Sequence, residues 1–368
     1  GWFNNRPMPR MSDFLDIVAL GTVADVVALD DNNRILVAQG LERIRAGQCR
    51  EGIKALLAVA KRERETIQAE DLAFAIAPRL NAAGRLDDMS HGIECLLADS
   101  PILAQQYAQE LDDLNIERRS IEGDMQQQAL ATMQQLNFNE ENLPPAIVLF
   151  DASWHQGVIG IVAGRLKEKF HRPSIVFAPV DEQSDLIKGS ARSIQGIHIR
   201  DAIELVTVRH AGLVSYFGGH AMAAGMTIPR ANFEAFQQAF SQVIAEQATE
   251  EHLTATILTD GELAAQEINL ELAQLLRHSG PWGQAFPEPI FEGEFELRDF
   301  TVLKEKHLKW LLKHPVTGED LEAIAFNVDM RQWSAQTQKL FLAYRLDVNT
   351  FRNKSRLQLK VDYWRVVE

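Results

Sequence analysis

Phe217-Gly218-Gly219-His220-Ala221-Met222-Ala223-Ala224-Gly225-Met226 is the stretch of this sequence that decides the fold. Its two glycines let the backbone turn tightly or pass close to a ligand, and the histidine is presented from that turn. The small residues that follow begin a closely packed helix or strand. A loop of this kind grips a phosphate through free backbone N–H groups and one titratable side chain. A glycine-rich turn with an ordinary structural histidine is the alternative for the motif taken alone.

Length and composition indicate a multidomain globular protein. The 368 residues are too many for one compact core, and 46% hydrophobic with 24% charged residues is typical of a globular chain. The net charge of −14 argues against a nucleic-acid partner, although an acidic protein can still carry one basic groove. Cys49 and Cys95 make no metal pattern and are typical of a reducing compartment, so we expect a cytoplasmic location. No apolar run has the length of a bilayer-crossing helix, so no membrane partner is expected.

The first part of the chain is expected to be a mixed region followed by a long helix. Residues 11–60 combine helical spacing with a short apolar run and are predicted to be mixed α/β. Ser100-Pro101 supplies an N-cap and a proline at the first helical position. Apolar residues at helical spacing then predict one long amphipathic helix over residues 100–136. We therefore place one domain in residues 1–99 and a connecting helix after it.

Residues 137–247 are predicted to form a second α/β domain. Apolar runs at 146–150 and 174–177 indicate buried strands, with a helix over residues 158–169 between them. An amphipathic helix over residues 231–247 completes this domain. The chain as a whole is therefore placed in the α/β class.

Residues 248–368 have a different pattern. Apolar and charged residues alternate in short segments such as 290–297 and 340–346, which predicts several strands. Strands at turn-rich spacing are typical of a small β-barrel. Trp310 and Phe341 are either core residues of this barrel or stacking platforms for bases.

Asp25 is a candidate metal ligand. It ends a small apolar element in Gly21-Thr22-Val23-Ala24-Asp25-Val26. A carboxylate at the tip of a buried element tends to face a cleft, and Mg²⁺ and Mn²⁺ prefer carboxylate oxygen. A helix cap or loop turn is the alternative for a lone aspartate.

Two arginines form the next candidate site. Arg79 and Arg85 flank Asn81 and a run of small residues. The arginine fork matches two phosphate oxygens, and small neighbours let a phosphodiester approach. An ion-pair cluster with Asp87 and Asp88 explains the same residues equally well.

Two further loops carry groups that suit a phosphate. His155 lies in a polar loop where a predicted strand ends and a helix begins, which is where ligands bind in open α/β sheets. Ser190 and Arg192 combine a hydroxyl and a cation beside glycine. Structural roles, as a cap and a surface turn, are the alternatives. Together these loops and Asp25 lead to the hypothesis of metal-assisted phosphodiester hydrolysis.

This combination of motifs resembles the DHH phosphoesterase superfamily and, within it, the RecJ single-strand-specific exonucleases. Residues 19–27 are similar to the family's fourth metal motif, which implies a ligand role for Asp25. Residues 79–85 resemble a segment at the DNA cleft of RecJ. Residues 154–163 and Gly218-Gly219-His220 resemble the accessory DHHA1 domain, whose Gly-Gly-His loop holds the substrate phosphate.

The resemblance also assigns the domains in order. It implies the end of a DHH domain in residues 1–99, the connecting helix in 100–136, a DHHA1 domain in 137–247 and an OB-type barrel in 248–368. The implied substrate-binding residues are Arg79, Asn81, Arg85, His155, Ser190, Arg192, Gly218 and Gly219.

The sequence departs from the family pattern at the metal ligands. The defining Asp-His-His and the earlier Asp-x-Asp motif are absent, so only Asp25 is present of the usual ligands. A two-metal site needs several carboxylates and histidines. We therefore expect the chain to be the carboxyl-terminal portion of a RecJ-like enzyme, inactive by itself, with exposed apolar surface.

For the complete enzyme, the resemblance implies 5′-to-3′ removal of nucleotides from single-stranded DNA in repair and recombination, with Mn²⁺ or Mg²⁺ in a two-metal site. His220 would contact the scissile phosphate as a hydrogen-bond donor or as an acid. The implied partners are single-stranded DNA and a single-strand-binding protein or a helicase, and a monomer is expected. A non-catalytic DNA-binding or scaffold protein is one alternative. A DHH phosphodiesterase of short oligonucleotides is another, and it predicts no added barrel.

Overall fold

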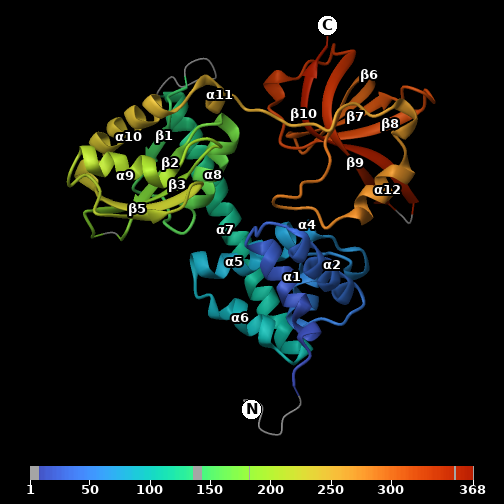
Figure 1. Cartoon of the computed structure of the whole chain (residues 1–368), viewed down its shortest axis with the longest axis horizontal. Coiled ribbons are helices and arrows are strands. Elements are labelled where there is room, and N and C mark those ends of the chain that lie inside the picture. The colour runs from blue at the N-terminus through green and yellow to red at the C-terminus, as the bar shows by residue number, and fades with distance from the viewer. Residues whose placement is uncertain (1–7, 136–142, 182, 352–353, 368) are drawn as a thin grey trace. The chain divides into compact units, whose positions relative to one another are not determined.

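The protein is described by a computed structural model over residues 8–135, 143–181, 183–351 and 354–367. Its residues cluster into two compact units, one combining Gly1–Ala77 with Ile257–Glu368 and the other comprising Pro78–Thr256. Figure 1 shows the helical start in blue, a sheet flanked by helices in green and yellow, and a barrel in orange and red.

The regular elements described in the amino-terminal region are all helices. Its elements are η1 (Met11–Phe14), α1 (Leu15–Ala24), α2 (Asp31–Arg45), α3 (Glu51–Val59), η2 (Arg64–Thr66), α4 (Ala69–Asp71) and η3 (Leu72–Ile76). The mixed α/β prediction for residues 11–60 was therefore wrong. The apolar run there is a helix, because its small residues let α1 and α2 pack closely: a Cβ on Gly40 of α2 would lie 2.2 Å from the carbonyl oxygen of Leu15.

Three further helices follow, α5 (Ala77–Leu86), α6 (Ser90–Leu97) and α7 (Pro101–Gln135). The prediction of one long helix is confirmed over the 35 residues of α7. Helix α7 buries small residues as well as larger apolar ones, since Ala104 and Ala108 are buried whereas Leu103 is 49% exposed. The small alanines let α6 pack against this part of α7.

A five-stranded sheet forms the core of the second unit. Its strands are β1 (Ile147–Phe150), β2 (Ser174–Pro179), β3 (Leu186–Arg192), β4 (Tyr216–Gly219) and β5 (Ala223–Pro229), in the order β1-β2-β3-β5-β4. Strands β1 and β2 are parallel, and the other neighbours are antiparallel. Helices α8 (Ile159–Phe170) and α7 cover one face, and helices α9 (Ile199–Arg209) and α10 (Phe233–Gln247) cover the other. Alternating side chains of the strands therefore feed two cores.

The carboxyl-terminal region is a closed barrel, as its alternating pattern predicts. The strands are β6 (Phe291–Leu303), β7 (His307–Lys313), β8 (Asp320–Ala325), β9 (Lys339–Phe351) and β10 (Lys354–Val366), in the order β10-β8-β7-β6-β9. Short helices η4 (Arg230–Asn232) and α11 (Glu250–Leu253) belong to the sheet unit, and η5 (Ala265–Glu267), α12 (Leu270–Ser279) and η6 (Met330–Gln332) to the unit of the barrel.

Three tryptophans fill the interior of the barrel. The ring of Trp310 lies 5.6 Å from that of Trp333 and 5.7 Å from that of Trp364. Trp310 is completely buried, so of its two alternative roles the core role is the correct one. The barrel also contacts the helical start within its own unit, where Lys360 forms a 2.7 Å ion pair with Glu70.

Candidate functional site

Strand β3 presents the Ser-x-Arg element on one face of the sheet. Ser190 and Arg192 are two residues apart and therefore point to the same side, while Ala191 between them is buried in the opposite core. Arg192 Nη1 donates to Ser190 Oγ at 3.1 Å and to the carbonyl oxygen of Ala191 at 2.8 Å. Neutral oxygens thus hold the guanidinium in place without neutralising its charge.

The first turn of α8 lies against this pair. A Cβ on Gly160 would be 2.9 Å from both Arg192 Nη2 and Ser190 Oγ, so only glycine leaves them their positions. The amino-terminal end of a helix carries partial positive charge and unpaired backbone donors. Gly160 therefore joins the Ser190–Arg192 pair to a second feature that favours anions.

Arg85 approaches the same helix from the carboxyl end of α5. Its Nη1 donates to the carbonyl oxygen of Gly157 at 3.3 Å, just before α8 begins. Its own carbonyl oxygen lies 2.1 Å from where a Cβ of Gly157 would be, so this glycine is required for the close approach. Asn81 is exposed one helical turn before Arg85 on α5.

Arg85 and Arg192 act on each other electrostatically. Burial lowers the pKa of Arg192, and the positive charge of Arg85 lowers it further. Burial also lowers the pKa of Arg85, while the carboxylate of Glu122 partly offsets this. Across the described part of the chain, neither guanidinium has a carboxylate within ion-pair distance. Two like charges held together without an ion-pair partner form a site that favours a dianion.

The strand-end loop holds His155 beside this cluster. His155 Nδ1 accepts a 3.1 Å hydrogen bond from the backbone N–H of Gly157, and the histidine is exposed. The preceding Trp154 is buried and donates to Gln128 Oε1 of α7 at 2.7 Å. The loop is therefore fastened to α7 while its histidine faces solvent.

The Gly-Gly-His motif forms the hairpin between β4 and β5. Gly219 has φ of 148°, a conformation that other residues rarely adopt, and His220 N–H donates to the carbonyl oxygen of Ala223 at 2.8 Å. Ala223 pairs with Arg192 in the sheet register. Gly218 and His220 are exposed. The hairpin thus presents His220 just before β5, and β5 is the neighbour of β3, the strand that carries Arg192.

Arg79 is placed differently from Arg85. Its Nη2 forms a 2.8 Å ion pair with Asp112 of α7, and both side chains are largely buried. The ion-pair alternative thus applies to Arg79, with Asp112 as the partner rather than Asp87 or Asp88. This contact ties α5 to α7.

Asp25 belongs to the other compact unit. It caps the carboxyl end of α1, where its N–H donates to the carbonyl oxygen of Gly21 at 3.0 Å, and it is exposed. The next residue, Val26, has φ of 54°, which is unusual for a β-branched side chain and forces a sharp turn after Asp25.

The described residues contain no group of three or more histidine, cysteine, aspartate and glutamate side chains that suits a metal ion. Asp25 is an oxygen donor of the type that Mn²⁺ and Mg²⁺ prefer, but one carboxylate does not hold two ions. The residues described here therefore do not by themselves form a two-metal site.

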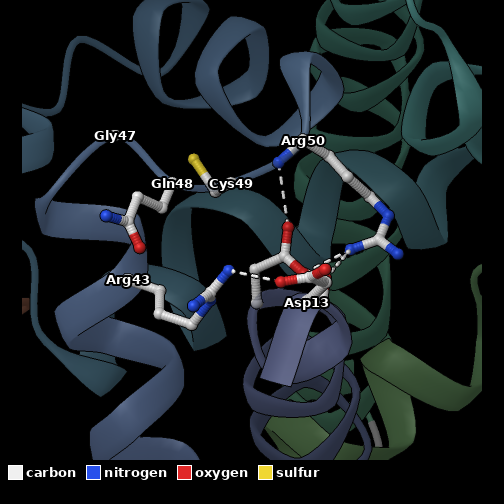
Figure 2. A pocket seen from close by; sticks show the side chains of 7 residues that line it. Asp13, Arg43, Gly47, Gln48, Cys49 and Arg50 are labelled. Carbon is white, nitrogen blue, oxygen red and sulfur yellow. Dashed lines mark hydrogen bonds and ion pairs between the residues drawn. The ribbon is translucent and has the colours of Figure 1, made fainter. Parts of the chain in front are cut away.

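A cavity of about 350 Å³ in the amino-terminal region was not foreseen from the sequence. It is lined by Asp13, Asp16, Arg43, Gly47, Gln48, Cys49 and Arg50 (Figure 2). Asp16 is 2% exposed, an unusual burial for a carboxylate within an apolar helix.

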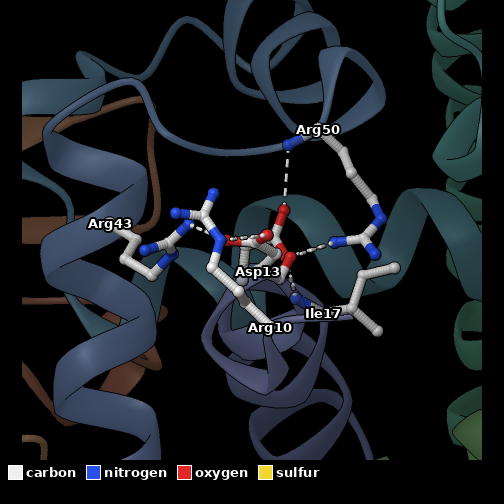
Figure 3. Close-up of polar contacts among 6 residues, drawn as sticks. Arg10, Asp13, Ile17, Arg43 and Arg50 are labelled. Carbon is white, nitrogen blue, oxygen red and sulfur yellow. Dashed lines mark hydrogen bonds and ion pairs between the residues drawn. The ribbon is translucent and has the colours of Figure 1, made fainter. Parts of the chain in front are cut away.

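The charges around this cavity are paired. Asp16 accepts hydrogen bonds from the backbone N–H of Ile17 at 2.8 Å and of Arg50 at 2.9 Å, and from the Arg50 guanidinium. Asp13 pairs with Arg43 at 3.1 Å and with Arg10 at 3.2 Å (Figure 3). The network holds the start of α1 against the start of α3.

The thiol of Cys49 also faces this cavity. Burial raises its pKa to about 11, so it is protonated at neutral pH and a poor nucleophile. With its carboxylates paired as well, the cavity has a structural role.

None of the described helices is long and apolar enough to span a bilayer. Among the described residues, neither Cys49 nor Cys95 forms a disulfide.

Two family models match the chain. A DHHA1 domain matches residues 143–246, and a RecJ OB domain matches residues 259–363. The expected DHHA1 domain and OB barrel, and with them the α/β fold class, are confirmed.

Curated relatives cover nearly the whole chain. The single-stranded-DNA-specific exonuclease RecJ of Dickeya dadantii is 49% identical over 366 residues, which is 99% of this chain and 63% of that protein. The RecJ of Escherichia coli is 48% identical over 98% of this chain and 63% of its own length. The chain thus spans less than two thirds of the length of these relatives.

A solved structure of RecJ from Thermus thermophilus in complex with Mn²⁺ is also similar. It superimposes with a TM-score of 0.82 at 28% identity, over 98% of this chain and 51% of that one. The corresponding complex with Mg²⁺ gives a TM-score of 0.81.

Proposed function

The chain belongs to the RecJ family, and on that premise we propose that it is the substrate-holding part of a single-stranded-DNA-specific 5′-to-3′ exonuclease of DNA repair and recombination. The observation that carries the proposal is the pair Arg85 and Arg192, which lie with Ser190 at the first turn of α8. The structure describes no carboxylate within ion-pair distance of either guanidinium. This site suits the 5′-terminal phosphate of a strand.

The proposal gives each group a task. Arg85 and Arg192 bind the terminal phosphate, and Ser190 orients Arg192 through their hydrogen bond. His220 contacts the scissile phosphate, either donating to a nonbridging oxygen or protonating the leaving oxygen. His155, Gly218 and Gly219 line the path of the strand. Arg79 and Asn81 support the backbone from α5, with Arg79 acting through its ion pair to Asp112.

The metal chemistry is proposed from the relatives. The Thermus thermophilus structures hold Mg²⁺ or Mn²⁺, and two such ions would supply an activated water and neutralise phosphate charge. Asp25 is proposed as one ligand. The residues described here do not fill the remaining coordination positions, so their own contribution is binding and orientation.

We also propose domain boundaries, partners, an oligomeric state and a cellular location. We propose residues 1–99 as the end of a DHH domain, with the other boundaries at 136 and 247. The OB barrel supports a single-stranded DNA partner. We also propose a single-strand-binding protein or a helicase as partner, a monomeric state and a cytoplasmic location. The location is supported by the two cysteines, which form no disulfide in the described structure.

The test is nucleotide release by the full-length gene product. With Mn²⁺ present, we expect release from 5′-phosphorylated single strands and far less from duplex. Asp25→Asn should abolish release yet leave binding of the strand in EDTA unchanged, because Asp25 is assigned to the metal and not to the phosphate. Strand binding without any release by the wild type would favour a non-catalytic DNA-binding protein. Release from dinucleotides but not from long strands would favour a short-oligonucleotide phosphodiesterase, against which the barrel argues.

A further inference from the structure

One buried carboxylate lies behind the two arginines of the proposed phosphate site. The inward stripe of α7 is apolar towards both ends but polar at its centre, where it buries Asn115, Arg118 and Glu122. Glu122 is 8% exposed and Arg118 is 9% exposed. Charged residues are rarely buried to this extent without a specific arrangement around them.

Both oxygens of Glu122 are taken by arginines other than Arg85. Oε2 accepts from Arg118 Nη1 at 2.6 Å, and Oε1 accepts from Arg165 Nε of α8 at 3.1 Å. Arg118 Nη2 donates to Asn115 Oδ1 at 2.7 Å, which fixes its orientation. Burial lowers the pKa of Arg165, but its bonds to Glu122 and Glu168 outweigh this and raise it.

Arg85 lies close to the same carboxylate. Leu86, the next residue on α5, packs against a cluster that includes Met125 of α7 and Ile159 of α8, so the end of α5 lies where these helices meet. The charge of Glu122 acts on Arg85, and the charges of Arg85 and Arg165 act on Arg118. The charge of one carboxylate therefore acts on three guanidinium groups, and two of them bond to it.

We propose that Arg165, together with Arg118, is a positioning residue that keeps Arg85 available for the 5′-terminal phosphate by occupying both oxygens of Glu122. This inference rests on the proposed function. If an oxygen of Glu122 were open, Arg85 would pair with it, since a partly buried guanidinium gains from a carboxylate partner. A substrate phosphate would then have to displace that carboxylate.

The experiment first removes Arg165, which competes with Arg85 for Glu122, and then removes the carboxylate of Glu122 itself. Full-length Arg165→Met, Glu122→Gln and the double variant are assayed for binding to 5′-phosphorylated and 5′-hydroxyl oligothymidylate in EDTA. Arg165 is the suitable position because its side chain is half exposed and its loss is compatible with folding. Glu168→Gln is the matched control, because it removes the other partner of Arg165 and leaves Glu122 occupied. Arg165→Lys should retain the wild-type preference.

The expected result is a loss followed by a rescue. Arg165→Met should reduce the preference for the phosphorylated strand about tenfold, the scale of one charge-assisted hydrogen bond. Adding Glu122→Gln should restore the preference, because a neutral amide does not compete for Arg85. A merely structural role predicts the opposite, since the double variant would then be at least as impaired as the single one.

Three outcomes overturn the proposal. They are an unchanged preference in Arg165→Met, a loss that Glu122→Gln does not rescue, and an equal loss for both strands. A wild type that binds strands without any preference for the phosphate would overturn the phosphate assignment itself, and this inference with it. Thermal unfolding of each variant identifies any that fails to fold. If Arg165→Met does not fold, Arg165→Gln, which also lacks the charge, takes its place with the same expected loss and rescue.

Discussion

The sheet domain and the barrel both carry cations on their strands, but they pair them differently. The barrel strands hold ion pairs between Lys309 and Glu322, Lys313 and Glu296, Lys339 and Glu294, Arg298 and Asp320, and Arg345 and Asp362. In the sheet domain, Arg192 of β3 bonds to a hydroxyl and a carbonyl oxygen instead. Cationic side chains are therefore neutralised by carboxylates on the barrel strands. Arg192 in the sheet domain has no carboxylate within ion-pair distance among the described residues.

The difference indicates which cations are available to bind an anionic ligand. Exposed pairs such as those on the barrel contribute little to stability, but they cancel the local positive potential. A partly buried guanidinium without a counter-ion is costly, and a phosphate compensates that cost when it binds. On the proposed function, we therefore expect the terminal phosphate in the sheet domain and expect the barrel to contact the strand mainly by other means.

The largest expected effect tests this contrast directly. Arg192→Met should weaken binding of 5′-phosphorylated single strands by about ten- to a hundredfold, because hydrogen bonds to charged groups contribute roughly 1.5–3 kcal/mol. Lys313→Met in the barrel should change affinity less than about twofold, since Glu296 already neutralises Lys313. Equal losses at the two positions, measured by fluorescence anisotropy in EDTA, would break the comparison.

The backbone of the Gly-Gly-His hairpin provides the second test. A Cβ on Gly219 would lie 2.4 Å from the carbonyl oxygen of Ala223, and its φ of 148° disfavours other residues. Gly219→Ala should therefore reduce the free energy of unfolding by about 1–3 kcal/mol. Gly218→Ala is the control, because nothing lies within 4 Å of its Cβ position. Urea unfolding that shows equal stability for both variants would refute the strained hairpin.

The third test separates stability from binding within α8. Gly160→Ala places a methyl group against Arg192 and Ser190, whose flexible ends must move away. We expect about a tenfold loss of phosphate affinity with little loss of stability. Gly164→Ala, where the Cβ has nothing within 4 Å, should leave affinity unchanged and stabilise the helix by about 0.5–1 kcal/mol. Binding titrations measure the affinity of the two variants, and thermal unfolding measures their stability.

The smallest effect concerns the pH dependence of the barrel's unit. Burial raises the pKa of Glu288 above its ordinary 4.5, despite the nearby charge of Arg345. The folded state then binds more protons than the unfolded state. Glu288 therefore contributes stability that is fully present below its ordinary pKa of 4.5. That contribution is lost as the pH rises through the raised pKa of the folded state. Glu288→Gln should flatten this decline in the melting temperature above pH 4.5.

Glu296 provides the opposite sign as a control. Its hydrogen bond with Lys313 lowers its pKa, so its contribution is present above 4.5 and is lost as the pH falls through the lowered value. Glu296→Gln should therefore remove a small decline on the acidic side. Identical pH profiles for the two variants would contradict the burial of Glu288.

Local patterns were sufficient to predict β1, β2, α8 and α10 of the sheet domain and several strands of the barrel, but not β3, β4 or α9. Alternation along β6 and β9 and the helical spacing of α7 reflect periodicities that a segment carries by itself. The run before Asp25 was ambiguous, because small apolar residues suit a buried helix and a buried strand equally. Its helical form depends on the close contact with Gly40, which only the folded chain brings there.

The candidate site was predictable in its residue types but not in its pairings. Arg79 and Arg85 lie six positions apart in one motif, yet one pairs with Asp112 and the other has no carboxylate partner in the described structure. That distinction arises from how α5 rests on α7. The need for Gly160 arises in the same way, from the meeting of α8 with β3.

The indole of Trp154 has a consequence for mechanics. Its hydrogen bond to Gln128 joins the loop of His155 to α7, the connecting helix. If the end of a strand binds to that loop, as proposed, it would therefore stiffen α7. Under the proposed function, bending of α7 would therefore be transmitted through this loop to the bound end of the strand.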